Sequence, residues 1–443
     1  MPSAPAGPAS LREVLERRVT DPRKPRGVRH KLSSLVSVLV AGVACGYSSF
    51  LAIAGAAAGW DAGVLAAHRT RRNPVTGAYE PPSASTLGRL PALLDADELE
   101  AAISQWLAGP ALDPASPARI AGRAEGKAGG VRPRKRKKPS AAEALAQVSA
   151  AGLVRAAPGH PWLDPAVIGE AGHRPAVRAV AVDGKERKLA KAGGKQKVHL
   201  LGAIAHDTGV VIGQDRVAKA GKANEITHFR PLLEPLPLDG VLITADAMQT
   251  QREHARWLVQ DKNAHYLLPA LGNQPGLFAA LDALPWEDTP AAAATVDVAR
   301  GRIETRTIRA LPAPAGPGFP HARQAILIER YVTIRKKGRW VPRNCEAVLY
   351  VTSLDPAQAS PADLLAAVRG HWRIEHLHWL RDVIWGEDKS TIRAGNAPQV
   401  MSALTNLIIS LFRLQGVTKI KAETRRNAQD PRRALQLLAL RPG

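Results

Sequence analysis

Two acidic residues each follow a short apolar run that has the composition of a β-strand. Asp183 follows residues 177–182, and Asp246 follows residues 241–245. Two strands that each deliver an Asp from one end can place both carboxylates at one edge of a sheet. Carboxylates held that close repel each other, and a divalent cation relieves the repulsion by taking oxygen ligands from both. The two acids therefore predict a metal site at a sheet edge.

Each acid also has a purely structural interpretation. Asp183 precedes Gly184, and an Asp-Gly pair commonly starts a turn. Asp246 precedes a segment that can form a helix, where an Asp side chain often caps the first turn. The two residues taken alone leave these possibilities open.

The elements around the acids follow an informative order. Residues 199–205 and 210–214 are β-type runs joined by Asp207-Thr208-Gly209, which predicts an antiparallel hairpin. A helix is expected from about Asn224, because apolar residues recur there at helical spacing. Strands then alternate with helices: a strand at 241–244, a helix at 252–260, a strand at 265–268 and a helix near 275. This βββαβαβ order predicts a ribonuclease H-like α/β fold, in which the first and fourth strands are neighbours.

The second half of the chain adds a β-rich segment and a helix with a third acid. Residues 286–353 are β-rich, with 301–309 alternating in the period of a strand, and are expected to form a β insertion in the same domain. Ser360 and Pro361 predict a helix start, with Ser as N-cap and Pro in the first turn. One continuous helix is expected from there to about Trp385, and it carries Glu375. A last helix is expected at residues 398–414.

The charge balance of the chain favours a polyanionic partner. Lys and Arg outnumber Asp and Glu by 61 to 39 in 443 residues, which gives a formal net charge of +22. An excess of this size favours nucleic acid over a membrane surface, although a basic protein that merely stays soluble is the plainer alternative. Cys45 and Cys345 lie far apart in sequence, so a disulfide is not expected and a reducing cytoplasm is the natural setting.

We expect four regions along the chain. Residues 1–107 predict a small helical domain, with a basic loop at 21–30. Residues 32–60 carry no charge, and we expect two packed soluble helices there rather than a membrane span. Residues 108–174, with a basic run at 132–138, predict a disordered linker or basic arm. Residues 175–415 are expected to form the main α/β core and 416–443 a basic tail.

With three acids in place, the chain resembles the bacterial insertion-sequence DDE transposases, in the group of the H-repeat-associated proteins. The N-terminal residues 21–23 and 26–30 resemble the helical domain that accompanies this group. The matching core motifs are residues 181–185 (Ala-Val-Asp-Gly-Lys), 224–227 (Asn-Glu-Ile-Thr), 244–248 (Thr-Ala-Asp-Ala-Met), 272–275 (Gly-Asn-Gln-Pro), 301–305 (Gly-Arg-Ile-Glu-Thr) and 371–375 (His-Trp-Arg-Ile-Glu).

The resemblance implies a specific activity and a specific site. Asp183, Asp246 and Glu375 would be the catalytic and metal-binding acids, holding Mg²⁺ with Mn²⁺ as a substitute. The enzyme would cleave and join the ends of its own insertion sequence. Its partners would be double-stranded DNA, both terminal inverted repeats and target, and a second copy of the chain on that DNA. It would work in the cytoplasm at the nucleoid, with no membrane partner. Candidate DNA contacts are Arg23, Arg26, Arg29, His30, Lys185, Asn273, Gln274, Arg373 and Lys389.

Other functions fit the same residues. One alternative is a catalytically inactive or repurposed relative that only binds DNA; another is a ribonuclease H-like nuclease that hydrolyses without joining. The sequence departs from the resembled pattern at His371 and Asp382, where related proteins often have Tyr and Lys, and at Leu271, where they have Lys. One residue fewer follows Glu375, which turns later helix positions by about 100°. Trp372 and Trp379 are expected in the core rather than as base-stacking groups.

Overall fold

The computed structural model describes most of the chain outside the expected linker. The described residues are 10–26, 28–112, 173, 176–192, 196–217, 225–299, 301–314, 318–337 and 339–438. The chain divides into two compact units built from interleaved segments. The first unit contains Met1–Glu125, Val182–Pro237 and Arg373–Gly443; the second contains Gly126–Ala181 and Leu238–Trp372. The expected linker and its basic run lie almost wholly outside the described residues.

The first unit begins with a cluster of helices. They are α1 (Leu11–Arg18), α2 (Leu32–Ala44), α3 (Phe50–Ala58), α4 (Ala62–Ala67), α5 (Ala84–Leu93) and α6 (Ala96–Leu112). Ser10, Ser49, Asp61 and Ser83 cap α1, α3, α4 and α5 by accepting a hydrogen bond from a first-turn amide. The uncharged stretch forms α2 and α3, as expected. Among the described residues, no helix has the length and apolar character needed to cross a bilayer.

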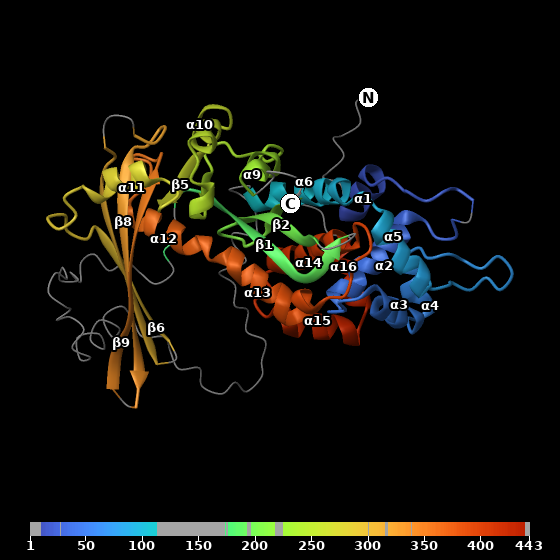
Figure 1. Cartoon of the computed structure of the whole chain (residues 1–443). Helices are drawn as coiled ribbons and strands as arrows, with labels where there is room; N and C mark the ends of the chain where they lie inside the picture. The colour runs from blue at the N-terminus through green and yellow to red at the C-terminus, as the bar shows by residue number, and fades with distance from the viewer. Residues whose placement is uncertain are drawn as a thin grey trace, which may run out of the picture. The chain divides into compact units, whose positions relative to one another are not determined.

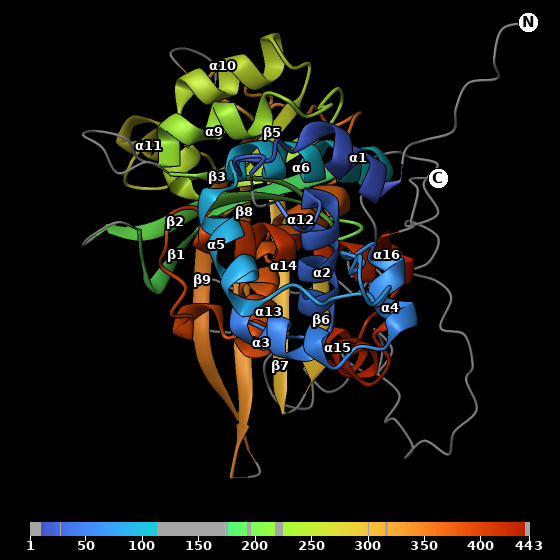
Figure 2. The same ribbon diagram turned by 90° about the vertical axis from the view of Figure 1, so that its right-hand side faces the viewer.

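The core of the first unit surrounds a C-terminal helix. That helix is α14 (Ala397–Leu414), whose side chains are buried along almost its whole length. It packs against α2, α5 and α6 and against β3 (Val211–Arg216), and Figure 2 shows α2 and α5 lying along it. The segment expected as a basic tail forms α15 (Ile420–Gln429) and α16 (Arg432–Leu438). The N-terminal helices and the end of the chain thus share one core.

Three strands and two helices complete the first unit. β1 (Ala179–Ala192) enters it at Val182, and β2 (Gln196–Ala205) pairs antiparallel with β3. The hairpin turn falls at the expected position, where Gly209 has a φ of +69° that favours glycine. α9 (Glu225–Leu233) packs on β2 and β3, and α13 (Arg373–Trp385) packs on β2. β1 is longer than expected and continues through Asp183.

The second unit is an extended sheet with short helices packed against one part of it (Figure 1). β4 (Leu242–Ala245) runs parallel to β5 (His265–Ala270), and β9 (Arg339–Thr352), β8 (Gln324–Lys336), β7 (Arg302–Pro312) and β6 (Ala293–Ala299) follow in antiparallel order. The helices are η2 (Ala247–Gln249), α10 (Arg252–Gln260), α11 (Pro275–Asp282) and α12 (Pro361–His371). Side chains of α12, including Leu364 and Leu365, are buried with residues of β4, β5, β7 and β8 in one apolar cluster.

The strand order confirms the expected fold class. Among the described residues, the order is β3-β2-β1-β4-β5-β9-β8-β7-β6. The first and fourth strands are therefore neighbours, as the ribonuclease H-like fold requires. The β-rich insertion continues the same sheet beyond β5, as expected.

The helix that carries Glu375 differs from the prediction. Instead of one helix from Pro361 to Trp385, α12 ends at His371 and α13 begins at Arg373. The Trp372 amide bonds to the Arg369 carbonyl at 3.3 Å, which tightens the last turn of α12. His371 therefore does not share a helix face with Glu375.

The placement of the two tryptophans in the core was also wrong. Trp372 is 55% exposed and Trp379 is 54% exposed. The break between α12 and α13 leaves Trp372 at the junction, and Ile374 and Leu377 supply the buried face of α13 instead. The imidazole of His376 stacks on Trp379, with ring centroids 5.5 Å apart.

Candidate active site

Asp183 lies on β1 beside the helix that carries Glu375. Its Oδ2 is 3.8 Å from Nδ1 of His378, and a quarter of its side chain is exposed. Burial, together with the nearby positive charges of Arg381 and Lys185, lowers the pKa of His378 to about 3. The imidazole is therefore neutral at physiological pH and does not compete with a cation for the carboxylate. His378 stands one helical turn after Glu375, so Asp183 lies near the helix face that both residues share.

Lys185 is held by two other carboxylates. Its Nζ lies 2.7 Å from Oδ2 of Asp382 and 3.7 Å from Oδ1 of Asp388, and its side chain is only 10% exposed. Alternate residues of a strand share a face, so Lys185 lies on the same face of β1 as Asp183. Without its two ion pairs, the Lys185 ammonium group could pair with the Asp183 carboxylate. The ion pairs direct its charge to the end of α13 and to η3 (Glu387–Lys389).

Glu375 is an exposed acid in the first turn of α13. Partial burial raises the pKa of its carboxyl. No hydrogen bond or ion pair joins it to another side chain among the described residues. Its carboxylate can therefore accept a ligand without first losing a partner.

Glu225 and His199 form a pair beside Gly184, although the sequence did not single them out as site residues. Successive residues of a strand face opposite sides of a sheet, so this pair lies on the face of β1 opposite to the Asp183 side chain. His199 Nε2 lies 2.5 Å from Oε1 of Glu225, which is the first residue of α9. A Cβ on Gly184 would overlap the Glu225 carboxylate, so that flexible side chain would have to move aside. The signal was present in the Asn-Glu-Ile-Thr motif and in the glycine that follows Asp183.

Asp246 stands at the end of β4 in the second unit. Its Oδ1 accepts a hydrogen bond from the Gln249 amide at 3.2 Å, so it does cap η2. The Leu242 amide donates to the Arg178 carbonyl at 2.8 Å, and the Thr244 hydroxyl donates to the Val180 carbonyl at 3.4 Å. From the first bond to the second, the residue number rises by two on both strands, so β4 runs parallel to the start of β1.

Other expected contacts of the second unit have structural partners. The Asn273 side chain donates to the Ala247 carbonyl, and Gln274 Nε2 donates to the Thr250 carbonyl at 2.8 Å. Both amides therefore fix the segment that Asp246 caps. His371 Nδ1 lies 3.1 Å from the Thr244 hydroxyl, and burial lowers the pKa of His371 to about 4.

A buried polar network fixes α13. Arg381 donates from Nε to Oε2 of Glu387 at 2.7 Å and forms a second bond to Oε1 at 2.5 Å. The Ser402 hydroxyl of α14 donates to the same carboxylate at 2.7 Å. Asn406 of α14 donates to Gln214 of β3 at 2.8 Å, and Arg381 reaches both amides. These charge-assisted bonds orient α13 within the first unit.

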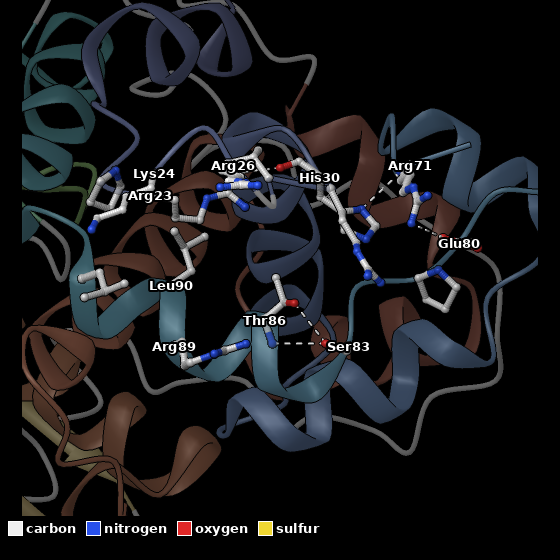
Figure 3. A pocket seen from close by; sticks show the side chains of 15 residues that line it. Arg23, Lys24, Arg26, His30, Arg71, Glu80, Ser83, Thr86, Arg89 and Leu90 are labelled. Carbon is white, nitrogen blue, oxygen red and sulfur yellow. Dashed lines mark hydrogen bonds and ion pairs between the residues drawn. The ribbon is translucent and has the colours of Figure 1, made fainter. Parts of the chain in front are cut away.

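The expected N-terminal DNA contacts line a single basic pocket between the loop at residues 22–30 and α5 (Figure 3). Arg23, Arg26, Arg29 and His30 all contribute to its wall. The remaining candidates, Arg373 and Lys389, are exposed on α13 and η3. Among the described residues, no group of three or more His, Cys, Asp or Glu side chains is close enough to hold a metal ion.

Comparison with known families places these residues in context. The family described as "Transposase DDE domain" matches residues 175–411, more than half of the 443-residue chain. The chain belongs to the DDE transposase family. The family described as "DDE_Tnp_1-associated" matches residues 14–107, which include the loop and α5 of the basic pocket. All three acids lie within the DDE transposase match.

Relatives of this DDE transposase-family chain carry related names. It is 34% identical over 250 residues to "Putative transposase YncI" of Escherichia coli O157:H7, a match that covers 53% of this chain and 61% of the relative. It is 26% identical over 288 residues to "H repeat-associated putative transposase YhhI" of E. coli K12, covering 59% of this chain and 71% of that protein. The chain thus spans less than two thirds of the length of YncI.

A solved structure is similar over most of the chain. It is titled "Cryo-EM structure of piggyBac transposase synaptic complex with hairpin DNA (SNHP)". The sequence identity is 10% and the TM-score is 0.34, with 95% of this chain and 82% of the other covered.

Proposed function

We propose that the chain is a DNA transposase that cleaves and joins the ends of its own insertion sequence. Asp183, Asp246 and Glu375 are its catalytic acids in this proposal. The main observation behind it is that, within the first unit, Asp183 lies beside His378, which is one helical turn from Glu375. Within the second unit, the start of β1 runs parallel to β4, and Asp246 directly follows β4. The proposal joins these two local arrangements into one site.

The donor chemistry of the three acids suits Mg²⁺. Hard divalent cations prefer carboxylate oxygens, and Mn²⁺ accepts the same ligands. Glu375 has no competing partner among the described residues, and Lys185 is occupied by Asp382 and Asp388. Two such ions, when bound, would activate the attacking oxygen and stabilise the leaving oxygen of an in-line phosphodiester displacement. The protein's part is to hold the three carboxylates in a fixed arrangement.

DNA is the proposed partner because the chain carries a net charge of +22. We propose that residues 1–107 bind the terminal inverted repeats, that residues 175–415 act on the strand, and that two copies assemble on two DNA ends. Arg373 and Lys389 are exposed near Glu375 in sequence and are proposed to contact phosphates. The proposed location is the cytoplasm, at the nucleoid.

The test is nicking and strand transfer on DNA that carries the element's own ends. Asp183→Asn, Asp246→Asn and Glu375→Gln keep side-chain size but each removes a charge that the cations need. Each change should abolish both reactions in Mg²⁺ and in Mn²⁺ while binding to the ends survives. Asp207→Asn and Asp239→Asn are the controls: Asp207 lies in the hairpin turn, where it accepts from Thr208, and the Asp239 carboxylate accepts from Asn263.

Three outcomes would contradict the proposal in different ways. If the wild type binds the ends but never nicks them with either metal, a DNA-binding relative without activity is the better description. If Glu375→Gln stays active while Asp382→Asn is inactive, the third acid is Asp382. Cleavage without any joined product would identify a hydrolytic nuclease.

A further inference from the structure

The helical region of the first unit contains a basic pocket of about 770 Å³. This volume falls within the roughly 300–1,000 Å³ range of ligand-binding pockets. Six of the residues that line the pocket are Lys or Arg, and Glu80 is the one acid among them. Figure 3 shows loop residues along one side of the pocket and residues of α5 along the other. Such an excess of cations around one hollow predicts an anionic ligand.

Two of the lining residues build the pocket. The Arg23 guanidinium donates to both Asp21 carboxylate oxygens, at 2.8 and 2.7 Å, and to the His30 carbonyl at 2.8 Å. Nδ1 of the buried His30 ring accepts a hydrogen bond from the backbone amide of Arg71 at 3.2 Å. These bonds close the loop on itself and fasten it to the segment that carries Arg71 and Glu80.

The other cations have their charges available to a ligand. Lys24, Arg26 and Arg29 are exposed, and none has an acidic partner among the described residues. Arg89 is exposed on α5, where its Nε donates to the Ser85 carbonyl at 3.2 Å. Arg71 is 3.3 Å from Glu80 and is largely compensated. The pocket therefore separates cations that hold the loop from cations that face the solvent.

We infer that this pocket seats the phosphodiester backbone of a DNA strand, with Lys24, Arg26, Arg29 and Arg89 contacting the phosphates. This rests on the proposed function, because it names the surface through which the helical region grips DNA. Arg26 and Arg29 come from the loop and Arg89 from α5, so the charges are spread along two walls and suit a chain of phosphates. The exposed Val28 and Leu93 on the same lining offer apolar surface to the sugars.

The chemistry favours a backbone contact over base recognition. Arg and Lys neutralise phosphates without reading sequence, and such contacts fix the position of a protein on DNA. Each one releases counterions, so the logarithm of the binding constant falls with the logarithm of salt by about 0.9 per phosphate on duplex DNA. We therefore expect the pocket to contribute a measurable part of the salt dependence of DNA binding.

The experiment measures the binding of full-length protein to a fluorescent duplex at several salt concentrations. The protein carries Asp183→Asn throughout, so that cleavage does not disturb the titration. Adding Arg26→Gln, Arg29→Gln and Arg89→Gln should lower the salt slope by about 2.7, three times the contribution of one phosphate. The loss should be equal on duplexes of different sequence. A thermal melt of each variant checks that the fold is kept.

The matched control removes charge elsewhere. Arg17 on α1 and Arg425 on α15 are exposed and lie outside the pocket lining. Arg17→Gln with Arg425→Gln should change the slope by less than one phosphate's share, with Arg26→Gln and Arg29→Gln as the two-charge comparison. Equal slopes for the pocket and control pairs would overturn the inference.

A second arm distinguishes DNA from a small phosphate anion. Inorganic pyrophosphate is titrated into the same proteins by calorimetry. Tight pyrophosphate binding that depends on Arg26 and Arg89, together with an unchanged DNA slope, would show a small-anion site and overturn the backbone assignment. The inference is also separable from the proposed function: if wild type fails to nick DNA but the pocket variants lose the salt slope, only the transposase activity is wrong.

Discussion

The ammonium group of Lys185 lies 2.7 Å from the carboxylate of Asp382, across 197 positions of sequence. This pair joins the strand that carries Asp183 to the helix that carries Glu375. Asp382 is a position where the chain departs from the resembled transposases, which often have Lys there. The structure gives the departure a partner, since Asp382 and Asp388 together take up the charge of Lys185.

We predict that Lys185 positions α13 rather than binding phosphate. Lys185→Met should reduce nicking at least tenfold, because it leaves Asp382 and Asp388 side by side without a cation. The reciprocal exchange, Lys185→Asp with Asp382→Lys, should recover part of the activity, since the attraction is restored with the signs reversed. A phosphate contact predicts the opposite: no recovery in the exchange, and a salt slope lower by about 0.9 for Lys185→Met.

The buried Arg381–Glu387 pair should dominate the stability of α13. Arg381 is 2% exposed and Glu387 is 6% exposed. Removing one partner of a buried pair leaves an uncompensated charge, at a cost of about 3–5 kcal/mol. Arg381→Met should therefore shift the urea midpoint strongly, and Arg381→Met with Glu387→Leu should recover much of the loss. The exposed pair Arg230–Glu234 is the control, where Arg230→Met should cost less than about 1 kcal/mol.

Local patterns gave the hairpin, α9 and the alternation of strands and helices, because their signals lie within ten to fifteen neighbouring residues. The turn at Gly209 and the apolar face of α9, with Phe229, Leu232 and Leu233 buried, are of this kind. The adjacency of β1 and β4 followed from the fold class that this order implies. The roles of the three acids came from the resemblance and remain predictions.

Features decided by distant partners could not be read from the sequence. The break at Trp372 turns His371 toward Thr244, which is 127 positions away. Lys185 was expected at a phosphate, but nothing near it in sequence indicates Asp382. Glu225 was visible in a motif, yet its closeness to Gly184 depends on how α9 packs on the sheet. The exposure of Trp372 and Trp379 likewise depends on where α13 begins and which of its faces is buried. The sequence pattern did not indicate the break at Trp372, so it could not predict that face.

Gly184→Ala should displace the Glu225 carboxylate by steric overlap. The added Cβ would overlap the Glu225 carboxylate, and the backbone there does not have a positive φ, so the effect is a matter of space alone. Nicking should fall only slightly, because the Glu225 side chain can move aside, and Glu225→Ala in the same chain should relieve the overlap and restore the loss. Gly55→Ala on α3 is the control, since nothing lies within 4 Å of its Cβ position. It should stabilise the protein by about 0.5–1 kcal/mol.

Glu100 should make the stability of the first unit depend on pH. Its carboxyl is 4% exposed on α6, where it accepts hydrogen bonds from Gln214 and, at 3.3 Å, from Gln399. Burial raises its pKa well above the ordinary value, despite the two hydrogen bonds. The folded protein therefore keeps a proton that the unfolded chain releases near its usual pKa of about 4.3. It follows that the free energy of unfolding falls as the pH rises above that value, until the raised pKa is passed.

Glu100→Gln should remove this contribution because an amide does not titrate. Urea unfolding between pH 4 and pH 8 should show the wild type losing stability relative to Glu100→Gln as the pH rises, by at most about 1.4 kcal/mol per pH unit. Glu253→Gln, which removes a carboxylate that is 82% exposed, is the control, and its curve should run parallel to that of the wild type. A difference between wild type and Glu100→Gln that stays constant over this range would show that Glu100 is ionised in the folded protein. The hydrogen bonds from Gln214 and Gln399 would then outweigh the desolvation of the carboxylate.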